Sequence, residues 1–94
     1  MLMQVFHRVN PFNEFSKVKK VALVNVNFNR DENKMLEETF RLTNTIDSDW
    51  KHNRWVFPTK HAGRSTMTGD VIQFRDRAFR VKANGFEEVN SLEQ

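Results

Sequence analysis

The chain has 94 residues, which is enough for one domain with a modest core and too few for a large enzyme with a deep, water-excluding pocket. Nine Phe and a hydrophobic fraction of 38% can supply that core, and the formal net charge is +3. The absence of Cys excludes disulfides, thiolate nucleophiles and sulfur-ligated zinc. No apolar run approaches the roughly 18 residues that span a bilayer. We therefore expect a cytoplasmic protein without a membrane partner.

The first third of the chain predicts two strands. Residues 3–9 alternate between apolar and polar side chains until Pro11, which cannot donate to a strand ladder. Residues 18–28 give the clearest strand pattern in the sequence. Asn25 and Asn27 fall on its solvent face. The expected core face consists of Ala22, Val24, Val26 and Phe28.

An amphipathic helix is predicted over residues 31–45. Asn29 can cap its start, and Glu32, three residues later, can reach back to the cap. Apolar and Thr side chains then recur at helical spacing, at Met35, Thr39, Leu42 and Ile46.

The second half of the chain predicts short strands between polar turns. The expected strands are residues 54–59, 71–74 and 78–83, with Asn84 and Gly85 as a left-handed turn. Phe86 is expected to fold back onto the core, and residues 89–94 form a frayed tail. The whole order predicts one α+β domain over residues 1–94, with four to five antiparallel strands packed against one amphipathic helix.

The residues that could carry catalysis do not form a recognisable set. His7, His52 and His61 lack the spacing of a metal site. The hydroxyls of residues 65–68 have no adjacent base that a third group could orient. We therefore expect a non-enzymatic protein that needs no metal and no cofactor.

The segment GRSTMTGD, residues 63–70, has the composition of a phosphate-binding loop. A Walker-type loop requires a Lys after the second Gly and a helix after that, and here Asp70 and a strand-like run follow Gly69 instead. Arg64 and its neighbouring hydroxyls could still hold a single phosphate or carboxylate. The alternative, which we favour, is that these side chains bond to the backbone and fix the shape of the loop.

Basic and aromatic residues concentrate between residues 50 and 82. From residue 51 to residue 82, eight Lys and Arg stand against two Asp, a balance of +6. Cations beside aromatic platforms are what binders of single-stranded nucleic acid use. The alternatives are a solvated surface, or Trp55 and Phe57 as core residues with Trp50 covering the helix end. The candidate binding residues are Trp50, Lys51, Arg54, Trp55, Lys60, Arg64, Arg75 and Arg77.

The segments FRLTNTIDSDW, GRSTMTGDVIQF, RAFRV and NGFEEV resemble a family of small accessory proteins of phages and mobile elements, similar to YodL-like domains and to small early proteins of T-even-type phages. The resemblance covers residues 36–89, and Met67-Thr68 replaces a Ser-Val common in relatives. A weaker likeness, to ASCH/PUA-like nucleic-acid modules, rests on residues 69–74. The motif residues expected to be structural are Arg64, Ser65, Thr66, Gly69, Asp70, Gly85 and Phe86.

The resemblance implies a host-takeover or counter-defence protein with no established catalytic residues, acting by binding a host macromolecule in the host cytoplasm. Two mechanisms remain open for the surface formed by residues 50–82. It could dock onto a host protein through exposed aromatic anchors. It could instead bind RNA or DNA through phosphate contacts and Trp stacking. An exposed sheet edge could also pair two copies of the chain as a homodimer.

Overall fold

The computed structural model describes residues 1–10, 12–13, 15–45 and 49–90. Within these residues the chain forms six strands, one α-helix and one short 3-10 helix. In chain order they are β1 (Leu2–Arg8), β2 (Val18–Asn25), α1 (Glu32–Thr43), η1 (Trp50–His52), β3 (Val56–Pro58), β4 (Val71–Phe74), β5 (Arg77–Lys82) and β6 (Gly85–Val89).

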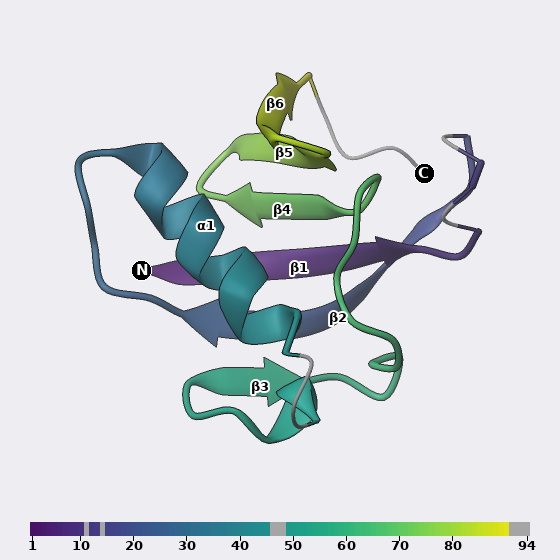
Figure 1. The fold of residues 1–94 in the computed structure, drawn as a ribbon, viewed down its shortest axis with the longest axis horizontal. Coiled ribbons are helices and arrows are strands. Elements are labelled where there is room, and N and C mark those ends of the chain that lie inside the picture. The colour runs from purple at the N-terminus through teal and green to yellow at the C-terminus, as the bar shows by residue number, and fades with distance from the viewer. Residues whose placement is uncertain (11, 14, 46–48, 91–94) are drawn as a thin grey trace.

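The strands form one open sheet in the order β3-β2-β1-β4-β5-β6, and every neighbouring pair is antiparallel. Helix α1 lies across one face of this sheet (Figure 1). The predicted α+β class is confirmed. None of the helices in the described ranges is long and apolar enough to cross a membrane.

The expected number of four to five strands was too low, because residues 85–89 form β6 rather than merely folding back. Gly85 has φ +138°, a backbone conformation that favours glycine, and it starts the return strand directly after the turn at Ala83 and Asn84. Phe86 then pairs with Val81 across the β5–β6 hairpin. The sequence signal for the turn was recognised, but the strand after it was too polar to stand out.

The main core lies between α1 and the sheet. Met35 and Leu36 of α1 pack against apolar side chains from five strands. The rings of Phe74 and Phe79 stack at 5.5 Å between their centroids. Of the predicted core face of residues 18–28, Ala22, Val24 and Val26 are buried. Phe28 is exposed, because β2 ends at Asn25 and the chain then leaves the sheet.

Helix α1 begins and ends within two residues of its predicted bounds. Its N-cap is Asp31, whose side chain accepts a hydrogen bond from the Asn33 amide, and Asn29 instead accepts one from the Asp31 amide at 2.8 Å. The helix therefore starts behind two successive capping side chains. Ile46, expected on the apolar face, lies outside the described residues.

The edge strand β3 has little capacity to pair with another strand. The Asn25 amide donates to the Trp55 carbonyl at 2.9 Å, and the Thr59 amide donates to the Val21 carbonyl at 2.8 Å. Phe57 pairs with Leu23 between these two bonds, so residues 55, 57 and 59 face β2. Of the two residues between, Val56 donates its amide to Asn53, and Pro58 has no amide hydrogen. A homodimer through a sheet edge would therefore use the edge of β6.

Candidate functional site

Asp70 is fully buried at the centre of a polar cluster just before β4. Its carboxylate accepts a two-pronged bond from Arg64, with Nη1–Oδ2 at 2.7 Å and Nη2–Oδ1 at 2.9 Å. The same oxygens accept the backbone amides of Arg8, at 2.9 Å, and Met67, at 2.8 Å. We call Asp70, Arg64, Arg8, His7 and Thr66 the Asp70 cluster. The Asp70 carboxylate has all of its hydrogen bonds within the protein.

The Asp70 cluster ties residues 63–70 to β1. Arg64 also donates to the carbonyls of Arg8, at 2.9 Å, and Ser65, at 3.0 Å. Arg8 returns a bond from its Nε to the carbonyl of Gly69, whose φ of +98° makes room for the turn. The fork that could have held a phosphate is thus occupied by Asp70, and Arg64 makes loop-shaping contacts.

His7 and Thr66 are hydrogen bonded within the cluster, with Nε2 and Oγ1 2.8 Å apart. The same ring nitrogen lies 3.7 Å from Asp70, so His7 cannot link a hydroxyl and a carboxylate through opposite nitrogens as a catalytic triad does. Burial lowers the pKa of His7 to about 4, and the Arg64 charge adds to this while Asp70 opposes it. His7 is therefore a neutral packing residue at physiological pH.

The two Trp residues have roles opposite to those in the alternative that made Trp55 a core residue and had Trp50 cover the helix end. Trp50 is buried, and its indole Nε1 donates to the carbonyls of Gly63 and Arg64 at 3.1 Å each. Trp55 is 50% exposed and Phe57 is 54% exposed. The reason is the register of β3, in which Val56 and not its neighbours points into the core.

The predicted basic residues are not gathered at one end of β4. Arg64 lies before β4 and Arg75 and Arg77 lie after it, at opposite ends of the strand. Arg77 bonds to Glu32 and Glu88, which raise the pKa of its guanidinium. Lys51 lies 3.7 Å from Asp49. The remaining predicted residues, Arg54, Trp55, Lys60 and Arg75, are exposed.

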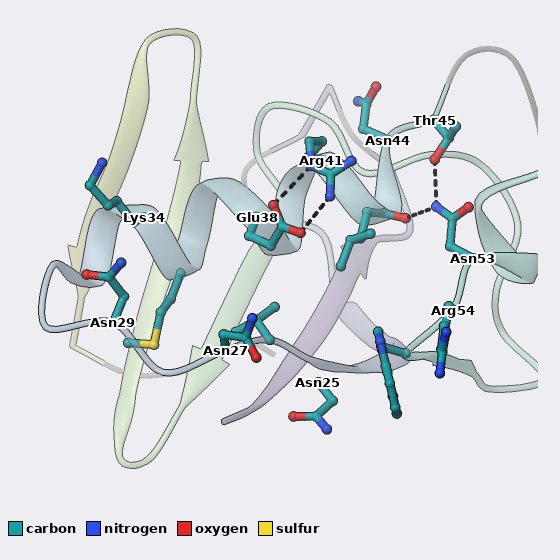
Figure 2. A pocket seen from close by; sticks show the side chains of 14 residues that line it. Asn25, Asn27, Asn29, Lys34, Glu38, Arg41, Asn44, Thr45, Asn53 and Arg54 are labelled. Carbon is teal, nitrogen blue, oxygen red and sulfur yellow. Dashed lines mark hydrogen bonds and ion pairs between the residues drawn. The ribbon is translucent and has the colours of Figure 1, made fainter.

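A groove of about 1030 Å³ opens between α1, the segment that follows β2, and residues 53–55 (Figure 2). We call it the asparagine groove, because five of its lining residues are Asn. It is lined by Asn25, Val26, Asn27, Asn29, Lys34, Met35, Glu38, Arg41, Leu42, Asn44, Thr45, Asn53, Arg54 and Trp55.

The charged side chains of the groove come from α1 and from Arg54. Lys34, Arg41 and Arg54 stand against Glu38, so the lining carries a net charge of +2. Glu38 and Arg41 are joined by two hydrogen bonds of 3.0 and 2.6 Å (Figure 2). The bond to Arg41 lowers the pKa of Glu38, which keeps both groups charged. The groove therefore attracts anions.

Several Asn side chains of the groove use only one half of their amide group in hydrogen bonds within the protein. Asn53 uses its Nδ2 to bond Leu42 and Thr45, at 2.7 and 2.8 Å, which leaves its oxygen. Asn29 uses its oxygen to cap Asp31, which leaves its NH₂ group. Asn27, two residues before Asn29, is exposed. The groove thus offers both donors and acceptors beside its cations.

Trp55 lines the groove and has a strained backbone conformation. Its φ is +71°, in the left-handed region that bulky side chains avoid. Such a conformation costs about 1–3 kcal/mol and persists where surrounding contacts impose it. Here the Asn25 amide bonds the Trp55 carbonyl, and the Arg54 guanidinium lies 4.9 Å from the centre of the indole ring. The strain holds a large aromatic ring at the surface.

The sequence analysis found Arg54 and Trp55 but not the rest of the groove. It placed Asn25 and Asn27 on a solvent face without giving them a role. The signal available was the alternation of Asn at residues 25, 27 and 29 between two apolar positions. The cations of α1 were not among the predicted binding residues, because nothing in the sequence brings residues 34–41 near residues 53–55.

No protein-family model, curated protein or solved structure matches the chain. The resemblance to phage accessory proteins therefore stays a prediction. In the part of the chain that the structure describes, no group of three or more His, Asp or Glu side chains could hold a metal ion. The fold and the groove define the protein as an α+β open-sheet protein with an amide-lined, cationic groove.

Proposed function

We propose that the protein binds single-stranded nucleic acid, RNA or DNA, in the asparagine groove. The observation that carries this proposal is the exposed Trp55 ring, held at positive φ in the lining of a groove with a net charge of +2. The positive φ of Trp55 belongs to the turn that the Val56 amide closes on the Asn53 carbonyl, and strained residues cluster at ligand-binding sites. A base would stack on the indole, and the adjacent phosphates would lie near the groove cations.

Each part of the groove has a role in this proposal. Lys34, Arg41 and Arg54 contact phosphates, which supply most of the sequence-independent affinity. The free amide halves of residues 27, 29 and 53 hydrogen bond to base edges, as Asn side chains do. Val26, Met35 and Leu42 provide apolar surface beside them. The groove thus suits a ligand that is anionic, aromatic and rich in hydrogen-bonding groups.

A single strand fits this chemistry better than a duplex or a neutral sugar. A duplex keeps its bases stacked on one another, so an indole has no base face to contact. A neutral sugar could stack on Trp55 and bond the amides, but the three cations would add nothing to its binding.

This proposal favours the nucleic-acid mechanism over docking onto a host protein. It also places the binding surface in the asparagine groove rather than on the surface predicted from residues 50–82. Only Arg54 and Trp55 are shared with the surface predicted from residues 50–82. We also propose that the protein is a phage-type accessory protein that acts on a host nucleic acid. The support for this part of the proposal is the sequence resemblance.

Titration of Trp fluorescence with a 20-nucleotide oligothymidylate or oligouridylate at several salt concentrations tests the proposal. We expect quenching of Trp55 and a groove contribution of about −2 to the log–log salt slope, at about −0.7 for each of three phosphate contacts. Trp55→Ala should lower the affinity by about 5- to 150-fold, because stacking on one base is worth about 1–3 kcal/mol.

Lys60→Gln is the matched control, because Lys60 is an exposed cation outside the groove. It should bind like the wild type, and its log–log salt slope should differ from that of the wild type by no more than a few tenths. Binding that is absent, insensitive to salt, or equally tight in Trp55→Ala overturns the proposal. Salt-independent binding of a neutral oligosaccharide at Trp55 would assign the groove to sugars instead.

A further inference from the structure

The loop between β1 and β2, residues 9–17, exposes two Phe side chains that the fold does not use. Phe12 is 90% exposed and Phe15 is 82% exposed. Val9 at the base of the loop is 62% exposed. Contiguous exposed apolar side chains on a small protein mark a contact surface. We call Phe12, Phe15 and the described residues between Val9 and Lys17 the Phe loop.

Polar side chains, and not the Phe rings, determine the shape of the Phe loop. The Asn10 side chain accepts the Phe12 amide at 3.1 Å, and the Asn13 side chain accepts the Phe15 amide at 2.9 Å. The Asn13 amide donates to the Asn10 carbonyl at 3.0 Å. These two successive Asx turns present the rings to solvent without burying either one.

The base of the Phe loop is fixed to the Asp70 cluster. Arg8, which is 2% exposed, donates from Nη1 to the carbonyl of Ser16 at 2.7 Å. The Ser16 hydroxyl accepts the Asn10 amide at 2.8 Å, and the Val9 amide donates to the Lys17 carbonyl at 2.9 Å. A loop held in this way loses little conformational entropy when a ligand binds.

Three exposed Lys residues follow the loop, at positions 17, 19 and 20. In the register of the hairpin, Lys19 lies opposite His7 and Lys20 opposite Phe6, so these two cations extend from opposite faces of the hairpin. Glu14 is the single acidic residue between positions 9 and 20. The Phe loop thus combines aromatic rings, Asn amides and a local excess of positive charge.

We propose that the Phe loop is a second contact site for the same single strand that occupies the asparagine groove, an inference that rests on the proposed function. Phe12 and Phe15 would stack on bases and the following Lys residues would contact phosphates. The support is that this loop repeats the chemistry of the groove, with aromatic rings, amides and cations together. Stacking on Phe is tolerant of sequence, so the loop adds affinity without base preference.

The groove and the Phe loop lie at opposite ends of β2 (Figure 1). Eight residue steps from Lys17 to Asn25 correspond to about 26 Å at about 3.3 Å per residue. Three nucleotides cover about 10 Å and twenty cover about 68 Å at the stacked spacing of about 3.4 Å. A 20-nucleotide strand can therefore reach both sites, whereas a trinucleotide can occupy one.

The test compares the affinities of a three-nucleotide and a 20-nucleotide oligothymidylate for the intact chain and for the double variant Phe12→Ser/Phe15→Ser. In the wild type the longer strand should bind at least about 100-fold more tightly, because the second contact is intramolecular. The double variant should lose about tenfold or more of its affinity for the 20-mer and none for the trinucleotide. Lys17→Gln/Lys19→Gln should reduce the 20-mer salt slope by about 1.4.

Phe57→Thr is the matched control, because Phe57 is an exposed ring outside both sites, and it should leave both affinities unchanged. Thermal unfolding should be the same for the double variant and the wild type, since neither ring is buried. A double variant that binds the 20-mer as tightly as the wild type overturns the inference while leaving the groove intact. If the double variant lost adhesion to anionic vesicles but not 20-mer affinity, the loop would belong to lipids. A wild type that binds neither oligonucleotide refutes the proposed function itself.

Discussion

In the Asp70 cluster, Arg64 and Asp70 form a two-pronged ion pair with the carboxylate fully buried, whereas in the asparagine groove Arg41 and Glu38 form a similar fork on an exposed helix surface. In the first case two backbone amides also bond the carboxylate. In the second case the pair leaves the surrounding amides and cations open to solvent. The same residue types thus fix a loop in one region and leave a binding surface in the other.

The two Trp residues show the same difference. Trp50 satisfies its indole N–H within the protein and packs 6.0 Å from the His7 ring. Trp55 is half exposed at positive φ in the turn that precedes β3. A side chain that is fully bonded and buried stabilises the fold, whereas a large exposed ring beside a groove is available to contact a ligand.

The largest expected contrast is between the two carboxylates. Asp70→Asn should lower the free energy of unfolding by about 3–5 kcal/mol, because the half-buried Arg64 and two backbone amides lose a charged acceptor. Glu38→Gln should change it by no more than about 0.5 kcal/mol, as for other exposed pairs. Urea unfolding measures both. Equal costs for the two variants would contradict the distinction between a structural cluster and an open groove.

The acid sensitivity of the fold should originate in the Asp70 cluster. The pKa of His7 is about 4 in the folded protein against 6.5 for a free side chain, because burial disfavours its charged form. Below pH 6.5 the unfolded chain therefore binds a proton that the folded chain does not. Stability should fall by about 3 kcal/mol as the pH drops from 6.5 to about 4, and this contribution should level off below pH 4.

His7→Gln provides the control for this pH dependence. Its amide can still donate to Thr66 Oγ1, but it does not titrate. Asp70, Arg64 and Trp50 are the charged and aromatic groups that face this position. Urea unfolding at intervals from pH 7 to pH 4 should show a flat profile for the variant. A variant with the wild-type slope would place the proton uptake elsewhere.

The Trp comparison predicts an intermediate effect. Trp50→Phe should cost about 2 kcal/mol, because two carbonyls lose their donor and the ring leaves a void. Trp55→Asn should change stability by less than about 1 kcal/mol, since Asn tolerates positive φ and the relief of strain offsets the lost contacts. Thermal unfolding compares the two. If Trp55→Asn proved as costly as Trp50→Phe, the Trp55 ring would be structural.

The sequence was sufficient for the elements whose pattern is local. The helix was predicted within two residues because caps and apolar spacing lie in one segment, and residues 71–74 were predicted with their observed bounds. The strand at residues 85–89 was missed because its exposed edge tolerates two Glu. The local turn at Gly85 was recognisable, but its consequence depended on pairing with β5.

The candidate site was less accessible to sequence reasoning, because it depends on contacts between distant segments. Asp70 was recognised as a turn residue, but its bond to the Arg8 amide spans 62 positions and could not be inferred. Burial likewise separated Trp50 from Trp55, which sit five residues apart in similar surroundings. Which Arg residues are structural and which are exposed depends on the carboxylates that the fold places next to each of them.

The smallest expected effect concerns the affinity of the groove. Glu38 occupies the guanidinium fork of Arg41 that would otherwise face a phosphate. Glu38→Gln should raise the affinity for a 20-nucleotide oligothymidylate about three- to fivefold, because it removes one negative charge and frees the fork. Glu37→Gln removes the neighbouring charge outside the groove, and it should change the affinity less than twofold. Equal gains for the two variants would show a general charge effect, and no gain for Glu38→Gln would mean that Arg41 does not reach the strand.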